Sequence, residues 1–492
     1  MFGLLIGEVI VFGTSWVIHD IFFRPDRVAP AGVNNVPRTD EGAPLPMIYG
    51  RCRVDAPTLA WIGNWLLVPR GAVGVAFVVD MLFVVGIPFY GGSTDLVSIY
   101  AGDFHLDIAA RPPDSMTRPG RFRYFSVNAF DVYGGDTKGG GIFGEIEFFD
   151  GRPDQQVSDY INDMDPDNHT VLQTRQTTSK WYPGRFDHPA LIEETLMPGY
   201  RNQAICLLYD WEIGEMPNFT SYSFEVRSLS TGTVSHLGFS LADDACPAAV
   251  IFDLLTSPWG KLGFPTSKID TASFVATAST LFSEGHGYSR AITGVEEASA
   301  LIADVLRQIG AVLYEEPTTG KLVLKLIRAD YNVNDLDDIN PDNMEAPSPG
   351  WFVVGGVSET YNQVRVSFTN RQNNYVDGLA IGQNAANAFS QSQRGLRSVD
   401  VHYAGCSDEA LAKKLASRDA AAASRPVITA TVIVNRNFYQ IRPGDVVTLT
   451  YPKLGVDHMV MRVGPVSLGQ LHDGKITLQL VRDDFDVTLG AF

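Results

Sequence analysis

The first half of the chain alternates short apolar runs with clusters of turn residues. Residues 47–54 and 58–68 have the composition of short strands, and residues 73–85 form a nearly unbroken run rich in valine and phenylalanine. Such a run is typical of a strand that is buried on both faces. Further strand-like segments follow at 96–101, 145–149, 203–211 and 221–227. The pattern predicts an all-β region with long loops up to about residue 235.

The apolar spacing becomes helical after Ala242. Helices are predicted over 247–255, with Asp243 or Asp244 as the capping residue, and over 271–282. The strongest helical pattern follows Thr293, where the sequence TGVE has the form of a capping box. Its apolar residues share one helix face, and these are Ala298, Leu301, Ile302, Val305, Leu306 and Ile309. Gly310 is expected to end this helix.

Short strands return after that helix. Residues 311–314 and 321–327 predict a hairpin packed on it, followed by the polar linker 332–349. The segment 363–368 then alternates apolar and polar residues, as in a half-exposed strand. One alanine-rich helix is predicted over 408–423, capped by Ser407. The remaining strands are predicted at 427–434, 446–451, 459–463 and 475–481, a spacing that favours a small barrel or sandwich.

These patterns divide the chain into four parts. An apolar N-terminal segment covers residues 1–30, and a first β-rich domain with inserted loops covers residues 31–235. An α+β domain covers residues 236–345, and a second β-barrel domain with one inserted helix covers residues 346–492. The predicted fold class is therefore multidomain and mainly β, with an α+β insertion.

The chain is acidic, with 38 Lys and Arg residues against 56 Asp and Glu residues, and its formal net charge is −18. Non-specific affinity for nucleic acid comes from basic side chains, so this balance excludes an ordinary DNA-binding protein. An acidic surface does suit the wall of a duct through which DNA slides, because it repels the polyanion. The hydrophobic content of 45% excludes a disordered chain.

The cysteines and the N-terminal segment carry no metal or secretion signal. The four cysteines lie far apart without a C-x-x-C pair, which predicts buried free thiols; they are Cys52, Cys206, Cys246 and Cys406. Residues 1–23 are strongly apolar but are interrupted by charged residues and lack a basic start or a cleavage site. A membrane-spanning helix is disfavoured by these charges. We expect an apolar segment that is buried in an assembly.

Two short motifs invite a chemical interpretation, and each is incomplete. Residues 139–144 fit G-x-G-x-x-G, but they lead into a strand-like segment and not into a helix, so they predict a flexible turn. Asp163, Asp165 and Asp167 have the spacing that opens a calcium loop. In that loop Asn168 stands in place of the glycine and Thr174 in place of the bidentate glutamate, which favours a solvated acidic loop.

Several single residues are of types that can act as acid/base or sugar-binding groups. His286 and the pairs Glu193-Glu194 and Glu315-Glu316 could transfer protons only if partners converged on them in a pocket, so surface or turn roles are favoured. Tryptophans fill cores and interfaces in β-rich assemblies more often than they line sugar sites; those considered are Trp61, Trp65, Trp181 and Trp211. The sequence therefore assigns no catalytic, cofactor-binding or metal-binding residue.

Five stretches carry a family resemblance. They are PMIYGR at 46–51, AAVIFDLLTSPWGKLG at 248–263, YNQVRVSFTNRQNNY at 361–375, RPGDVVTLTYP at 442–452 and LVRDDFD at 480–486. In this order they resemble the phage tail hub family, which includes the baseplate hubs of tailed phages, tail-tip attachment proteins and the hubs of gene transfer agents. Together the stretches span most of residues 46–486.

The resemblance implies a structural virion protein, not an enzyme, with no cofactor. It implies a homotrimer in which each chain contributes two tail-tube-like β-barrels, built from residues 31–235 and 346–492, so that six barrels face a hexameric tube. The trimer would close the distal tail tube at the tail tip or baseplate. Its partners would be tail tube proteins, the tape measure protein and tip or fibre proteins, with DNA present only in transit. We expect assembly in the host cytoplasm and no stable membrane insertion.

The chain also departs from part of that family. Lambda-like attachment proteins continue into fibronectin-like and receptor-reading regions, whereas the last predicted strand here lies close to Phe492. We therefore expect this subunit to support fibres or tip proteins. Two other functions stay open: a glycan- or wall-degrading tail enzyme, which needs two carboxylates about 5–10 Å apart in a groove, and a surface protein anchored in a membrane by residues 1–23.

Overall fold

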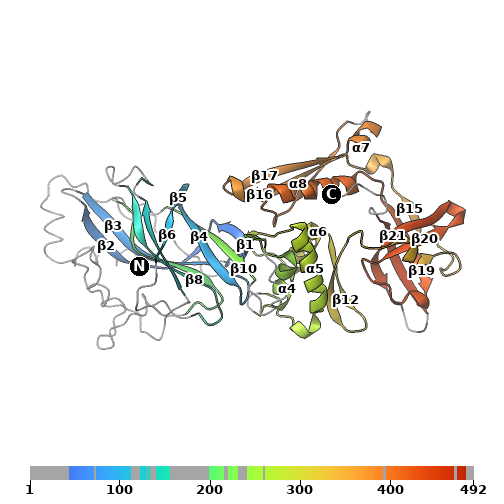
Figure 1. Ribbon diagram of the computed structural model, residues 1–492, viewed down its shortest axis with the longest axis horizontal. Coiled ribbons are helices and arrows are strands. Elements are labelled where there is room, and N and C mark those ends of the chain that lie inside the picture. Colours follow the sequence, from blue (N-terminus) through green and yellow to red (C-terminus); the bar gives the residue numbers. More distant parts are fainter. Residues whose placement is uncertain are drawn as a thin grey trace, which may run out of the picture.

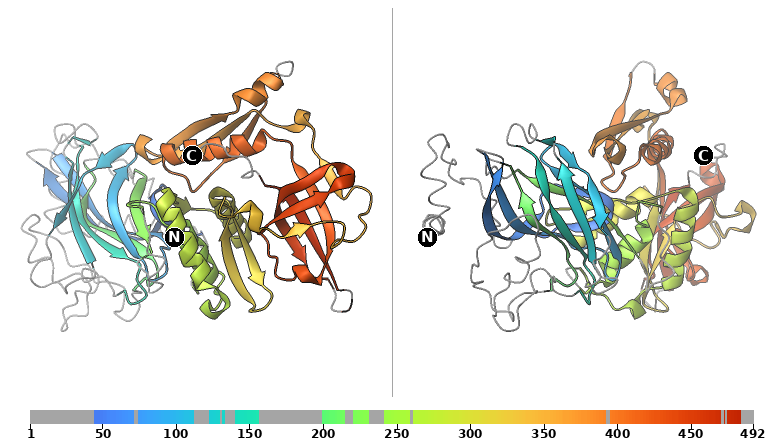
Figure 2. Two further views of the ribbon diagram at one scale, coloured as in Figure 1. Left: turned by 45° about the vertical axis from the view of Figure 1, so that its right-hand side comes forward. Right: turned by 60° about the vertical axis from the view of Figure 1, so that its left-hand side comes forward.

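The computed structural model describes residues 44–70, 74–111, 122–129, 131–132, 140–155, 199–214, 220–230, 241–258, 261–391, 395–469, 472 and 474–483. Four units with separate hydrophobic cores make up this part of the chain (Figures 1 and 2). We call them the first β unit, the α+β unit, the three-stranded unit and the C-terminal β unit. The predicted multidomain, mainly β fold class is confirmed.

The first β unit consists of two sheets. Its strands are β1 (Met47–Val54), β2 (Thr58–Arg70), β3 (Gly74–Gly86), β4 (Ser93–Ala101), β5 (Phe104–Leu106), β6 (Ile108–Arg111), β7 (Phe122–Ala129), β8 (Ile142–Asp150), β9 (Ala204–Glu212) and β10 (Tyr222–Leu229). One sheet has the order β2-β3-β9-β8-β7-β6. The other has the order β11-β1-β10-β4-β5, in which β11 (Arg290–Ile292) comes from the α+β unit.

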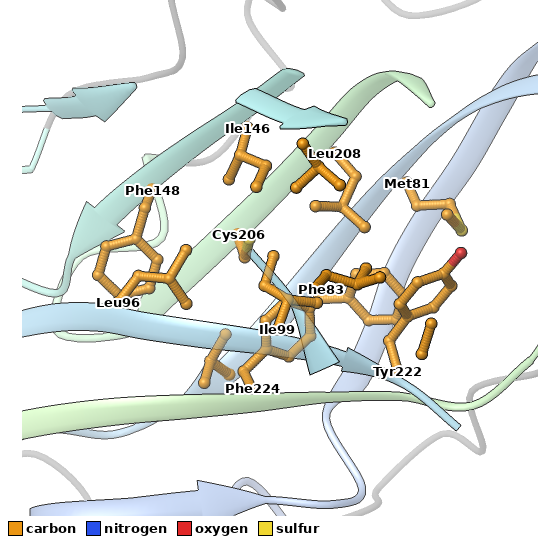
Figure 3. Close-up of a cluster of buried hydrophobic side chains, with 14 of the residues drawn as sticks. Met81, Phe83, Leu96, Ile99, Ile146, Phe148, Cys206, Leu208, Tyr222 and Phe224 are labelled. Carbon is orange, nitrogen blue, oxygen red and sulfur yellow. The ribbon is translucent and has the colours of Figure 1, made fainter. Parts of the chain in front are cut away.

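The core of the first β unit lies between its two sheets. Figure 3 shows Met81 and Phe83 of β3 and Cys206 of β9 facing Ile99 of β4 and Phe224 of β10. Alternate residues of β3, such as Leu82 and Val84, lie in a second buried cluster on the opposite face of the strand. The prediction that this apolar run is buried on both faces is confirmed.

The α+β unit packs three helices against a hairpin. Its elements are α4 (Pro247–Thr256), η5 (Thr266–Lys268), α5 (Thr271–Glu284), β11, α6 (Ala298–Ile309), β12 (Ala311–Glu316) and β13 (Lys321–Leu326). Gly310 ends α6 in the left-handed conformation, with φ 62°, as the sequence predicts. In Figure 1 the helices stand between the first β unit and the C-terminal strands.

The predicted helix caps were wrong in three places. Cys246 is the N-cap of α4, because Asp243 and Asp244 are drawn into contacts with other units. Helix α6 begins after Glu297 without the predicted capping box, since Glu296 pairs with Arg290. The N-cap of the next long helix, α8 (Glu409–Ala423), is Asp408, whose side chain accepts from Leu411 N, and not Ser407.

The three-stranded unit is a small sheet backed by α8. Its elements are β16 (Gln363–Asn370), η8 (Arg371–Asn373), β17 (Val376–Gln383), α7 (Ala385–Ser390), β18 (Ser398–His402) and α8. The sheet order is β17-β16-β18, and β18 runs parallel to β16. The predicted apolar face of β16 packs against α8, where Val366 and Phe368 share a core with Leu415.

The C-terminal β unit is a six-stranded sheet that curls around its own core (Figure 1). Its elements are η6 (Val333–Asp335), β14 (Asp338–Ile339), β15 (Phe352–Val354), η7 (Val357–Glu359), β19 (Ile428–Asn435), η9 (Arg436–Phe438), β20 (Val446–Tyr451), η10 (Pro452–Leu454), β21 (Val456–Ser467) and β22 (Lys475–Arg482). The strand order is β14-β20-β21-β22-β19-β15.

Two cores and two α-helices thus occupy the range 346–492, where the sequence predicted one barrel with one inserted helix. The difference arises because the apolar face of β16 is buried by α8 and not by the C-terminal sheet. The apolar segment 1–30 lies outside the described residues. No described helix is long and apolar enough to span a bilayer.

Candidate functional site at the junction of the units

The buried carboxylate of Asp244 lies where the α+β unit meets the three-stranded unit. Its Oδ1 accepts from Ser289 Oγ at 2.5 Å, from Arg371 Nη1 at 2.5 Å and from Ser407 Oγ at 3.1 Å. Asp244 is 8% exposed, and these donors replace the hydrogen bonds to water that a polar group loses on burial. Residues 163 positions apart in sequence are held together here.

The backbone around Asp244 is packed too closely for side chains. A Cβ on Gly287 would lie 2.4 Å from the Cβ of Asp244. A Cβ on Gly405 would lie 2.0 Å from the ring of Tyr288, and Ser289 N donates to Gly405 O at 2.9 Å. A side chain on Gly287 would displace Asp244 within the α+β unit, and one on Gly405 would push the three-stranded unit away from Tyr288.

A second buried carboxylate, Glu225 of β10, links the first β unit to the three-stranded unit. Its Oε1 accepts from Arg51 Nε at 2.7 Å and from the Tyr375 hydroxyl at 2.6 Å, and its Oε2 accepts from Ser98 Oγ at 2.8 Å. Arg51 also pairs with Asp243 at 2.9 Å. Burial favours a higher pKa for Glu225, but the hydrogen bonds outweigh it and lower the pKa below its usual value. Glu225 is therefore ionised at neutral pH.

Helix α4 is tied to the first β unit by hydrogen bonds from both members of a buried ion pair. Asp253 of α4 accepts from the Tyr49 hydroxyl at 3.0 Å and pairs with Lys261, whose side chain is 1% exposed. Lys261 also reaches Pro88 O at 3.4 Å. The other oxygen of Asp253 accepts from Tyr90 N at 3.1 Å. Every one of these contacts joins residues more than 150 positions apart except the local Asp253–Lys261 pair.

The α+β hairpin is joined to the C-terminal β unit by further ion pairs. Arg442 makes a two-pronged contact with Glu316, with both distances 2.7 Å, and Lys325 pairs with Asp445. The hydrogen bonds from Arg442 lower the pKa of Glu316 to about 2. Paired guanidinium and carboxylate groups of this geometry fix orientation as well as distance.

The three-stranded unit is joined to helix α6 by arginines. Arg418 Nη1 donates to Gln308 O at 2.7 Å, and Arg307 Nη2 donates to His402 O at 3.0 Å. Both guanidinium groups also lie over the ring of Tyr403. The C-terminal end of α6, where carbonyls lack helical partners, thus receives cationic donors from another unit.

The residues considered as acid/base groups do not form a catalytic pair in the described structure. Burial, with help from nearby cationic side chains, lowers the pKa of His286 to about 3, so this histidine is neutral at physiological pH. Glu316 is engaged by Arg442, and Glu315 is exposed on the same strand. Glu193 and Glu194 lie outside the described residues.

The glycine-rich motif, the aspartate motif and the tryptophans lie partly inside and partly outside the described residues. The turn predicted for 139–144 was wrong for residues 142–144, which already belong to strand β8. Gly139 and the Asp163–Asp167 loop lie outside the described residues. Among described residues no cluster of three metal-ligating side chains occurs. Trp211 is a core residue whose Nε1 donates to the Tyr222 hydroxyl, and Trp61 packs on the outer cluster of the first β unit. The Trp65 side chain and Trp181 are not described.

The predicted buried free thiols are confirmed for all four cysteines. Burial raises the pKa of Cys52 and of Cys406 to about 12, so both stay protonated.

A cleft of about 330 Å³ lies between β1 and the three-stranded unit. Arg51, Arg53, Arg290 and Tyr375 are among its lining residues. Each arginine already has a carboxylate partner, so the cleft does not present an uncompensated positive charge. Of these arginines, Arg51 also links two units through its pair with Asp243.

Sequence reasoning missed the linking residues. Asp243, Asp244 and Ser407 were assigned to local helix caps, and Arg371, Tyr375 and Glu225 were not singled out at all. The available signal was composition: charged residues flank the apolar strands, and Gly287 and Gly405 lie within two residues of a tyrosine.

The fold and the junction define a class: a mainly β protein of several units, whose buried charges join one unit to the next. Residues 297–466, from the start of α6 into β21, match a family model described as putative phage tail protein. The resemblance to phage tail proteins that the sequence indicated is thereby confirmed. No curated protein matches the chain.

Solved structures that are similar to this chain include the following three. A chain from the virion of a native gene transfer agent particle matches 100% of this chain and 97% of its own length, with 13% identity and a TM-score of 0.57, which shows a shared fold. The tail protein from Neisseria meningitidis MC58 matches 80% of this chain and 97% of its own, with 12% identity and a TM-score of 0.32. The 43 kDa tail protein of prophage MuSo2 from Shewanella oneidensis matches 84% and 90%, with 12% identity and a TM-score of 0.29.

Proposed function

We propose that this chain is a non-enzymatic structural subunit of a phage-type virion tail, acting as a trimeric hub that closes the distal tail tube at the tail tip or baseplate. The observation that carries the proposal is the use of buried charges as links between units, with Asp244 and Glu225 each shared by more than one unit. A duct under mechanical stress needs units that keep their relative positions, whereas a hydrolytic site needs carboxylates that face a substrate. The family match and the full-length similarity to a gene transfer agent chain support this assignment.

The two β units per chain support the trimer. Three copies would present six β units to a hexameric tube, so that threefold and sixfold rings meet without mismatch. The net charge of −18 suits a lumen that DNA crosses without being held. The proposed partners are tail tube proteins, the tape measure protein and tip or fibre proteins, in the virion after assembly in the host cytoplasm.

The first test is the mass of the purified full-length chain in solution by light scattering. We expect three times the 53.8 kDa chain mass, and a threefold ring with a near-sixfold outline by negative-stain imaging. A monomer at all concentrations, together with hydrolysis of host wall polymers by the purified chain, would contradict the proposal. Loss of hydrolysis on substitution of a carboxylate would then show that the chain itself is a hydrolase that uses this carboxylate.

A further inference from the structure

The cleft between the first β unit and the three-stranded unit is bridged at the tip of the β16–β17 hairpin. The two units contribute to different hydrophobic clusters and different sheets among the described residues. Figure 1 shows β16 and β17 extending toward the first β unit. At their tip, Tyr375 donates its hydroxyl hydrogen to Glu225 Oε1 at 2.6 Å. The contact across the cleft is therefore polar and does not depend on a shared apolar core.

The backbone of the tip is held in an uncommon conformation. Asn374 and Tyr375 both lie in the left-handed region, with φ of 53° and 60°, and Tyr375 N donates to Asn370 O at 2.9 Å. Asparagine adopts this region readily, but a bulky aromatic residue does so only where surrounding contacts hold it there. The hydrogen bond to Glu225 is such a contact, so its loss would let Tyr375 relax.

Release of Tyr375 would not leave a buried charge without partners. Glu225 would keep Arg51 at 2.7 Å and Ser98 at 2.8 Å. The neighbouring Arg371 would remain anchored to Asp244 and Ser407, and would act as the pivot for the tip. The tip can therefore leave while both networks stay satisfied.

We propose that the tip, residues 372–376, is a latch over the cleft, and that the hydrogen bond from Tyr375 to Glu225 is what keeps it closed. The closed state brings the first β unit and the three-stranded unit into contact. The open state widens the entrance to the 330 Å³ cleft beside Arg53 and Thr369. The latch is a property of the single chain and does not depend on the proposed role in a tail.

The test measures the distance between spin labels on either side of the cleft in the full-length chain. Cysteines replace Ala56 on the first β unit and Asn373 on the tip, both of which are exposed. The native cysteines are buried and free, so the introduced thiols react first. The parent chain should show one dominant distance. Tyr375→Phe should add a longer distance, with the open-to-closed ratio rising by about ten- to a hundredfold.

Two further variants keep the outcome interpretable. Tyr361→Phe removes the hydroxyl of a tyrosine two residues before β16, whose ring lies beside Arg397, and should leave the distance distribution unchanged. Tyr375→Asn fits the left-handed backbone but lacks the hydroxyl, and should also open the latch. If Tyr375→Phe and Tyr375→Asn both give the parent distribution, or if Tyr361→Phe opens the tip equally, the latch is refuted.

Discussion

At the scale of single residues, the charged side chains of this protein are positioned by partners from distant parts of the sequence. Glu316 and Arg442 are 126 positions apart, yet they form a two-pronged contact with little solvent exposure. Glu315, the neighbour of Glu316, is exposed. The direction in which a strand residue points, and not its chemical type, decides which of the two glutamates becomes a link.

The Glu316–Arg442 pair should make stability depend on pH. The pKa of Glu316 is about 2 in the folded chain against an ordinary value of 4.5. Because the folded pKa is the lower one, the stabilisation is complete above pH 4.5 and is lost as the pH falls toward 2. Glu316→Gln should lower the free energy of unfolding at pH 7 by about 1–2 kcal/mol.

Urea unfolding at pH 7 and near pH 2.5 would measure this effect. The difference between the parent chain and Glu316→Gln should shrink at the lower pH, where the glutamate is largely protonated when unfolded and partly so when folded. Glu315→Gln is the matched control, and its effect should be within about 0.5 kcal/mol at both pH values. A pH-independent loss for Glu316→Gln would mean that the pair contributes through packing and not through charge.

At the scale of elements, helix α8 and strand β17 pack so closely that their backbones approach each other without a side chain between them. A Cβ on Gly382 of β17 would lie 2.1 Å from the carbonyl oxygen of Ala416 in α8. The alanine-rich composition of α8 allows this approach, since its buried face includes Ala412, Ala416 and Ala420. Small residues on the helix and glycine on the strand together set the spacing of the three-stranded unit.

Gly382→Ala should therefore push β17 away from α8. We expect a loss of about 1–3 kcal/mol in the free energy of unfolding, the usual cost of overpacking. Faster amide hydrogen exchange in α8 would locate the loss in this unit. Gly294→Ala is the control, because a Cβ there meets nothing within 4 Å. Equal and small effects of both substitutions would show that the backbone contact is not restrictive.

At the scale of the whole molecule, the α+β unit holds the other three together. It reaches the first β unit through Asp253, the three-stranded unit through Asp244, and the C-terminal β unit through Glu316. The left view of Figure 2 places its helices between the first β unit and the C-terminal strands. Loss of one link should therefore uncouple one unit and leave the others folded.

Asp244→Ala should uncouple the three-stranded unit. The substitution removes the carboxylate that faces Arg371, whose side chain is 17% exposed, and we expect a cost of about 2–3 kcal/mol. Scanning calorimetry should then show a separate transition at lower temperature. Asp304→Ala, which removes a half-exposed pair with Arg307, should leave the profile within error of the parent. A single unshifted transition for Asp244→Ala would argue against this coupling.

The sequence by itself determined most of the elements. Strand β1 was predicted at the residues where it lies, and the ends of α6 and β20 were placed within a few residues. These features depend on local periodicity and on stop signals such as Gly310, which act over one or two turns of chain. The multidomain, mainly β class follows from the same local patterns.

The tertiary structure alone decided which elements share a core and which charges meet. Strand β11 joins the sheet of the first β unit, β18 pairs with β16 in parallel, and Ser407 bonds Asp244 instead of capping α8. Each of these outcomes joins segments separated by tens to hundreds of residues, and no local pattern states which face of one unit will meet another. Packing between units and the pairing of each buried charge decide them. Both exist only once the chain is folded.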